Sequence, residues 1–95
     1  MGGEVRHYRD NTGLECDAII LLEDGRWGAV EIKLGGEKLI EEGASTLKRL
    51  QNKIVEKSSE KKPSFLMVLT AISETYIRED GMVVAPITSL KRSLS

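Results

Sequence analysis

The chain has 95 residues, of which 40% are hydrophobic and 31% are charged, and its formal net charge is -1. These values are typical of a globular domain and exclude a membrane span, because no apolar run approaches the ~20 residues that a spanning helix needs. A net charge near zero provides no global attraction to nucleic acid, so any such contact must come from a local patch. The N-terminus lacks an apolar signal segment, and the single cysteine, Cys16, cannot form an internal disulfide. We therefore predict one cytoplasmic domain over residues 1–95.

The first part of the chain is predicted to form three consecutive antiparallel strands. The first strand, Val5 to Arg9, ends at the turn-forming residues Asp10-Asn11-Thr12-Gly13. The second strand covers Leu14 to Leu22, and the third runs from Arg26 to about Leu34, with Glu23-Asp24-Gly25 between them. Two successive hairpins follow from this order.

A helix and a buried strand are predicted next. From Glu37 onward, apolar residues recur at spacings of three and four, which is typical of an amphipathic helix: Leu39, Ile40, Ala44, Leu47, Leu50 and Ile54. Gly43 weakens the middle of this helix slightly. The continuous apolar run from Phe65 to Thr70 is typical of a strand that is buried on both faces.

The last part of the chain is predicted to form a hairpin and a short helix. Asp80-Gly81 separates strands over 76–78 and 82–85, and Pro86 predicts that the last strand ends or lies at an edge. A short final helix is expected to begin at Thr88 or Ser89 and to continue through Leu94. Strands, then a helix, then further strands predict an α/β or α+β fold with a mixed sheet and helix cover.

The loop Glu23-Asp24-Gly25 decides which residues of its two strands face each other. A three-residue hairpin loop with glycine in the left-handed third position pairs Leu22 with Arg26. A two-residue Asp24-Gly25 loop would instead shift the pairing by one residue and reverse the face of every side chain in one strand. We predict the three-residue loop, because the shifted register splits both the charged and the apolar residues across the sheet.

In this register, charged side chains gather at one corner of one face of the sheet. Asp17 lies opposite Glu31, and Glu15 lies opposite Lys33. Facing carboxylates repel unless a cation compensates, and Mg²⁺ is held by one or two carboxylates together with water and phosphate oxygens. We predict Asp17 and Glu31 as ligands of Mg²⁺ or Mn²⁺, supplemented by the backbone carbonyl of Ile32 and by Glu15. Lys33 would then orient the attacking water or stabilise charge on the phosphate.

Other interpretations of these residues stay open. Alternating charged and apolar residues also describe any half-exposed antiparallel strand, and Glu15 could simply pair with Lys33. The basic run over 47–62 is either a solvated helix face or a local nucleic-acid contact. The candidate nucleic-acid-binding residues are Arg9, Lys48, Arg49 and Lys53. Cys16 is expected on the opposite, apolar face as an inert thiol.

With these residues, the chain resembles the PD-(D/E)XK nuclease superfamily, whose signature is an acid in one strand and acid-x-lysine in the next. Here Asp17 and Glu31-Ile32-Lys33 match that signature. More narrowly, four segments resemble the nuclease-like C-terminal module of prokaryotic AAA-type ATPases of uncharacterised function: 8–10, 13–17, 29–33 and 80–87. The resemblance implies a restriction-endonuclease-like αβββαβ core, with Asp17 and Glu31 as Mg²⁺ ligands and Lys33 as the catalytic lysine.

The chain departs from this family in two ways. The family core opens with a helix, which we do not expect before the first strand of this sequence, and residues 1–95 contain no Walker A segment. We therefore expect residues 1–95 to be the C-terminal fragment of a larger ATPase-type protein. The expected function is that of a divalent-metal-dependent nuclease-like domain that acts on or binds nucleic acid. The alternatives are a catalytically inactive nuclease-fold module that binds or regulates an AAA-type ATPase, and self-association into a homodimer through the exposed first strand.

Overall fold

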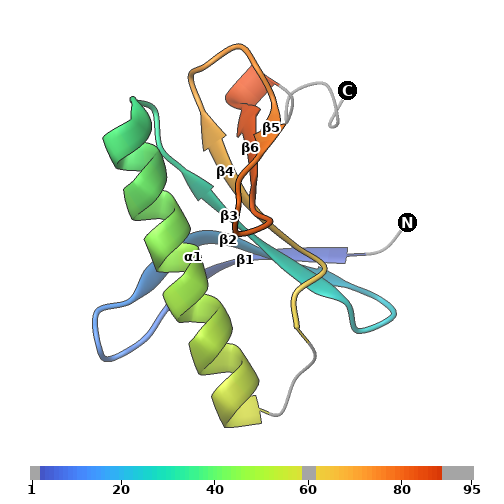
Figure 1. Cartoon of the computed structure of the whole chain (residues 1–95). Helices are drawn as coiled ribbons and strands as arrows, with labels where there is room; N and C mark the ends of the chain where they lie inside the picture. The colour runs from blue at the N-terminus through green and yellow to red at the C-terminus, as the bar shows by residue number, and fades with distance from the viewer. Residues whose placement is uncertain (1–2, 59–61, 89–95) are drawn as a thin grey trace.

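The computed structural model describes residues 3–58 and 62–88, and over these residues the chain forms a single mixed sheet and one long helix (Figure 1). The elements are, in chain order, β1 (Gly3–Arg9), β2 (Glu15–Leu22), β3 (Trp27–Ile32), α1 (Glu37–Ser58), β4 (Phe65–Thr70), β5 (Tyr76–Ile77) and β6 (Val83–Pro86). The strand order is β1-β2-β3-β4-β6-β5. The predicted α+β class with a mixed sheet and helix cover is confirmed. The predicted final helix falls almost wholly outside the described residues.

Parallel and antiparallel pairings meet at the centre of the sheet. β1, β2 and β3 pair antiparallel in succession, whereas β3 pairs parallel with β4, and β4 pairs parallel with β6. The crossover from β3 to β4 is made by α1. β4 therefore lies between two strands, which accounts for its continuous apolar sequence and confirms that it is a buried strand.

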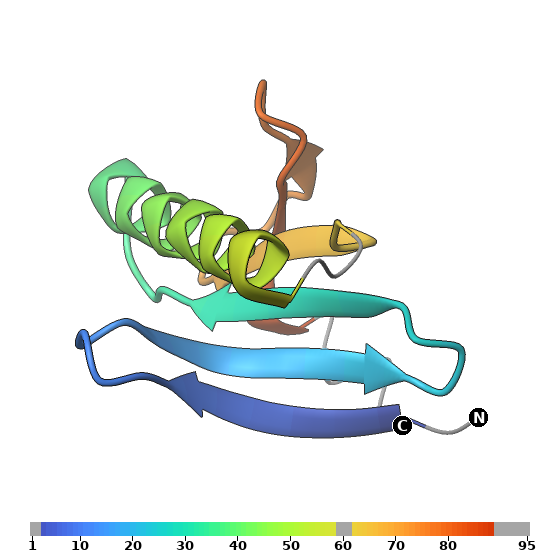
Figure 2. The same cartoon turned by 90° about the horizontal axis from the view of Figure 1, so that it is seen from below.

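The helix α1 packs diagonally over one face of the sheet, mainly against β3 and β4, while β1 and β2 extend beyond it (Figure 2). Its apolar side meets the sheet in the main core, whose fully buried members include Leu47, Leu50, Val68 and Val84. A smaller cluster of Val30, Leu69 and Ala85 lies apart from this core, with half-buried apolar side chains around it. Within the described ranges, no helix is long and apolar enough to cross a membrane.

Three turns of the sheet share one geometry. Each has glycine in the left-handed region at its third position, with φ of 90° at Gly13, 89° at Gly25 and 85° at Gly81. In each, the glycine N–H donates to the carbonyl of the residue before the loop, and that residue's own N–H donates to the carbonyl of the residue after the loop. Only glycine adopts this backbone at little cost. The predicted hairpins follow directly from these turns.

The predicted register of the β2–β3 hairpin is confirmed. The N–H of Leu22 donates to the carbonyl of Arg26 at 2.8 Å, as a three-residue loop requires. The ladder continues as far as Ala18 opposite Val30, so that the next position of the two strands holds Asp17 and Glu31. The two predicted acids therefore meet at the end of this ladder.

One expectation about β2 is wrong. Its pairing with β1 shifts between Arg6, which faces Ile19, and Tyr8, which faces Cys16, so β2 has one additional residue at this point. Such a β-bulge interrupts the alternation of side chains between the two faces. Cys16 is consequently fully buried in the main core on the helix side, together with Leu14, and not on the opposite face.

Candidate functional site

The predicted catalytic and metal-binding residues line one open hollow of about 320 Å³. The hollow lies where the β2–β3 ladder ends and is closed on one side by α1. It is lined by the three signature residues Asp17, Glu31 and Lys33, together with Glu15 and Ile32. Two residues of α1, Thr46 and Arg49, also line it. Sequence reasoning missed Thr46, although its position three residues before Arg49 places both on one side of the helix.

The two carboxylates of the hollow are bonded to the backbone of the opposite strand. Oε1 of Glu31 accepts the N–H of Asp17 at 2.9 Å, and Oδ2 of Asp17 accepts the N–H of Ile32 at 2.8 Å. The side chains thus satisfy backbone donors at the end of the regular ladder, beside the bulge. This reciprocal arrangement fixes the positions of both carboxylates.

The environment of Glu31 disfavours its charged form. The residue is only 5% exposed, and this burial, together with the negative charge of Asp17, raises the pKa of the Glu31 carboxyl. The bond from the Asp17 N–H and the charge of Lys33 act in the opposite direction but do not cancel the effect of burial. A cation placed in the hollow would stabilise the ionised carboxylate.

Cys16 is fully buried and is not among the residues that line the hollow. Its Sγ is 3.4 Å from the carbonyl oxygen of Val30, and burial raises the pKa of its thiol to about 11. The thiol is therefore neutral at physiological pH, whereas a nucleophilic cysteine reacts as the thiolate.

The position of Lys33 depends on a glycine of the helix. Its N–H donates to the carbonyl of Leu69 at 2.8 Å, which continues the pairing of β3 with β4 beyond Ile32. A Cβ atom at Gly43 would lie only 3.1 Å from Cγ of Lys33 and 3.3 Å from the side chain of Val68. Gly43 thus allows α1 to approach the sheet beside Lys33, a role that the helix pattern alone does not indicate.

The donors of the hollow suit a hard divalent cation. Asp17 and Glu31 offer carboxylate oxygens, and Ile32 offers a backbone carbonyl. In the described part of the chain, no group of three or more His, Cys, Asp and Glu side chains could hold a metal ion. Any cation here would need water or substrate oxygens to complete its coordination, which is the usual manner of Mg²⁺.

The four basic residues predicted to contact nucleic acid have different surroundings. Arg49 lines the hollow, and Lys48 is exposed on α1. The ammonium of Lys53 instead bonds Oδ2 of Asp10 at 2.8 Å, and Arg9 forms an ion pair with Glu15. Glu15 therefore pairs with Arg9 and not with Lys33. Arg49 and Lys48 are the two whose charge is not already used in an ion pair of the described structure.

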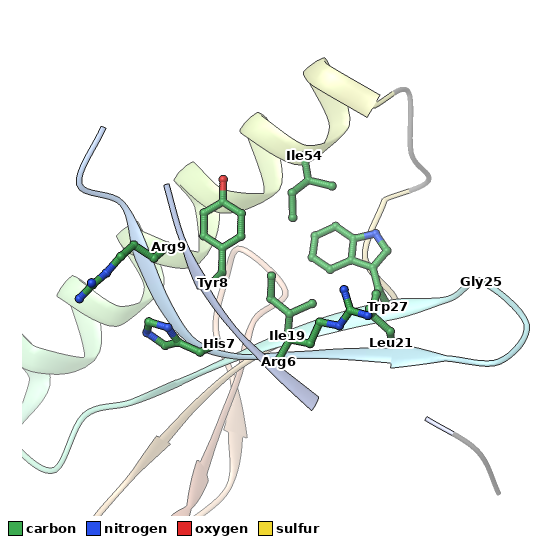
Figure 3. A pocket seen from close by; sticks show the side chains of 9 residues that line it. All are labelled: Arg6, His7, Tyr8, Arg9, Ile19, Leu21, Gly25, Trp27 and Ile54. Atoms are coloured by element: carbon green, nitrogen blue, oxygen red, sulfur yellow. The ribbon is translucent and has the colours of Figure 1, made fainter. Parts of the chain in front are cut away.

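A second hollow, of about 420 Å³, lies beyond the edge of α1 over β1 and β2 (Figure 3). Ile54 of the helix points into it from above, while Tyr8, Ile19 and Trp27 rise from the sheet. Its walls are largely apolar, and Arg6 lies at its margin. None of the predicted metal-binding residues lines this second hollow.

Fold and site together define an α+β domain with a hollow at the end of a β-hairpin, and two carboxylates and a lysine line this hollow. The family model described as "Domain of unknown function (DUF4143)" matches residues 2–90, and the chain belongs to this family. The match includes every residue of the hollow. Comparisons with curated proteins and with solved structures gave no match.

Proposed function

We propose that this domain is a divalent-metal-dependent nuclease-like domain that acts on the phosphodiester bonds of nucleic acid. The observation that carries the proposal is the meeting of Asp17, Glu31 and Lys33 in one hollow, in the register that the PD-(D/E)XK resemblance requires. Two helix residues, Thr46 and Arg49, line the same hollow and supply a hydroxyl and a guanidinium, both of which bind phosphate.

Each side chain of the hollow has a proposed role. Asp17 and Glu31, with the carbonyl of Ile32, would hold Mg²⁺ or Mn²⁺. A bound divalent ion polarises the phosphate and lowers the pKa of a coordinated water. Lys33 would orient the attacking water and stabilise negative charge that develops on the phosphate, while Arg49 would hold a non-bridging phosphate oxygen.

Cleavage assays test this proposal. Labelled single-stranded and duplex DNA and RNA would be incubated with the chain and Mn²⁺. We expect cleavage that chelation abolishes and that Lys33→Ala reduces by about 100-fold or more, the loss typical of one charge-stabilising group. Lys38→Ala is the matched control, because Lys38 is an exposed lysine of α1 that does not line the hollow. Cleavage that is equal in both variants would contradict the proposal.

A second function is favoured by the hydrogen bonds of the carboxylates. Because Asp17 and Glu31 each accept a backbone N–H, both acids have a structural use that needs no metal. This supports an inactive nuclease-fold module that binds nucleic acid or regulates an AAA-type ATPase. Domains of this family are often found at the C-terminus of such ATPases, which supports an ATPase as the partner.

Binding measurements distinguish the two kinds of partner. An inactive nucleic-acid-binding module should bind labelled oligonucleotides with an affinity that falls as salt rises, and Arg49→Ala should reduce that salt dependence. Arg26→Ala is the control, since Arg26 is an exposed arginine at the far end of the hairpin, paired with Asp24. Absent or salt-insensitive binding would direct attention to protein partners.

A further inference from the structure

The outer edge of β1 has the features of an interface between strands. β1 is the first strand of the sheet order, and every residue of it except Tyr8 is exposed. Val5, near its centre, is 72% exposed. Unpaired backbone groups on such an edge are a template for a further strand.

The hydrogen bonds of the neighbouring strands show which backbone groups of β1 have no partner within residues 3–58 and 62–88. The N–H of Leu22 points to β3. The backbone N–H and C=O groups of successive residues in a strand point to opposite sides, so those of Leu21 and Ile19 point to β1. The backbone groups of their partners in β1, Glu4 and Arg6, therefore point toward β2. The backbone N–H and C=O groups of Gly3, Val5 and His7 point outward, away from β2.

We propose that β1 pairs antiparallel with β1 of a second copy of this chain, around a two-fold axis at Val5. In this register Val5 faces Val5 of the copy, and Gly3 faces His7 of the copy, so that all three outward-pointing residues form hydrogen-bonded pairs. Glu4 then faces Arg6 of the copy, and the reciprocal pair forms on the other side of the axis.

Charge selects this register over its neighbours. An axis at Arg6 would place the two copies of Arg6 directly opposite each other, and an axis at Glu4 would do the same with Glu4. With an axis at His7, Glu4 would no longer face Arg6 of the copy, and the opposite-charge pairs would be lost. Opposite charges across strands stabilise the pairing, while like charges directly opposite destabilise it.

The side chains on both faces of β1 are compatible with this arrangement. On the helix side, Arg6 now bonds Glu4 of its own strand at 2.6 Å, and the side chains of both residues are about 60% exposed or more. An exposed pair of this kind contributes little, so its exchange for a pair across the axis costs little. On the opposite side, Val5 is the neighbour of Ile20, and the two copies of Val5 would extend the smaller apolar cluster across the interface.

Only a short strand segment would be buried, so the dimer should be weak. We expect a dissociation constant of roughly 10⁻⁵ to 10⁻³ M, as for interfaces smaller than the standard size. The proposal is independent of any nuclease activity, because no residue of the candidate site takes part.

Cysteine cross-linking of the full chain tests the register. Under mild oxidation, Val5→Cys should form a disulfide-linked dimer, because facing residues of a hydrogen-bonded pair have Cα atoms about 5.5 Å apart. His7→Cys is the matched control: it points to the same face, but at this register it lies about 13 Å from its copy along the strands. The wild-type chain provides the background of Cys16, which is fully buried. Equal cross-linking of both variants, or none above background, would overturn the proposal.

Charge reversal tests the pairing without a covalent bond. Sedimentation equilibrium at high concentration should show dimers of the wild-type chain and at least tenfold weaker association of Glu4→Lys and of Arg6→Glu, each of which creates like-charge pairs. An equimolar mixture of these two variants should associate again, because positions 4 and 6 of one variant then face residues of opposite charge in the other. Circular dichroism would confirm that both variants fold. Association that is unchanged in the single variants would place the contact elsewhere, and a wild-type chain that stays monomeric would also refute it.

Discussion

At the residue scale, the observed structural role of Glu31 and Asp17 can be separated by experiment from their proposed role as metal ligands. Each carboxylate accepts a backbone N–H, and burial raises the pKa of Glu31. Removal of the acceptor leaves a backbone donor unsatisfied, whereas an amide of the same shape keeps an acceptor but loses the charge. The structural use and the proposed metal-binding use therefore respond differently to conservative substitution.

The metal prediction concerns thermal stability. Mn²⁺ in the millimolar range should raise the Tm of the wild-type chain, because a ligand that binds only the folded state stabilises it. Asp17→Asn should fold with a similar Tm in the absence of metal and show no increase on addition of Mn²⁺. Mg²⁺ and Ca²⁺ titrations by differential scanning fluorimetry provide the comparison. An equal increase in the wild-type chain and in Asp17→Asn would place any bound ion outside the hollow.

A pH prediction concerns Asp10. The Lys53 ammonium and then the Thr12 hydroxyl hold the pKa of the Asp10 carboxyl well below its usual range. A carboxyl whose pKa is lower in the folded state stabilises the fold above its unfolded pKa of about 3.9, and this contribution is lost as the pH falls toward the folded value.

Asp10→Asn should therefore lower the Tm at pH 7, and its difference from the wild-type Tm should shrink progressively below about pH 4. Thermal melts at a series of pH values measure that difference. Glu42→Gln, an exposed substitution on α1, is the control. A difference that stays constant down to pH 2 would show that Asp10 acts through shape and not through charge.

At the element scale, glycines serve two different purposes in this sheet. Gly25 adopts φ of 89° in the turn between β2 and β3, and apart from its own chain neighbours no described residue lies within 4 Å of the place where a Cβ would lie. Gly28 has an ordinary strand conformation, but a Cβ there would lie 2.2 Å from the ring of Phe65, its partner in β4. The first glycine is required by the backbone, the second by a neighbouring side chain.

Alanine substitutions should reveal this difference. Gly25→Ala should cost about 1–2 kcal/mol because an L-residue is strained in the left-handed region, and Gly28→Ala about 1–3 kcal/mol through overpacking. Phe65→Leu should relieve part of the Gly28→Ala cost and none of the Gly25→Ala cost. Urea unfolding of the single and double variants measures both couplings. Equal relief of the two would contradict this division of roles.

At the scale of the whole molecule, stability depends on one main core between α1 and the sheet. Leu47 is fully buried there, while Ile77 of β5 is 72% exposed. Leu47→Ala should reduce the free energy of unfolding by about 2–5 kcal/mol, and Ile77→Ala should leave it within about 0.5 kcal/mol. Trp27, which is 3% exposed and the only tryptophan, reports unfolding by its fluorescence. A small effect of Leu47→Ala would show that the helix contributes little to the core.

Local features of the sequence predicted most of the fold. The three glycine turns determine two hairpins of the first half and one of the second, because a left-handed third residue closes each loop whatever surrounds it. The helix follows from its apolar spacing, and β4 from its continuous apolar run. The loop before Arg26 even determined the register that brings Asp17 to Glu31.

Only the tertiary structure decided the details of the site. The bulge in β2 turns Cys16 into the core, and no local signal marks it, because it depends on how β1 pairs with β2. The packing of α1 across the sheet adds Arg49 to the hollow and directs Lys53 to Asp10. Sequence determined which short segments form strands, turns and helix, since those preferences are local. Which charges remain free and which are paired is a property of contacts between distant residues, and the folded chain alone determines it.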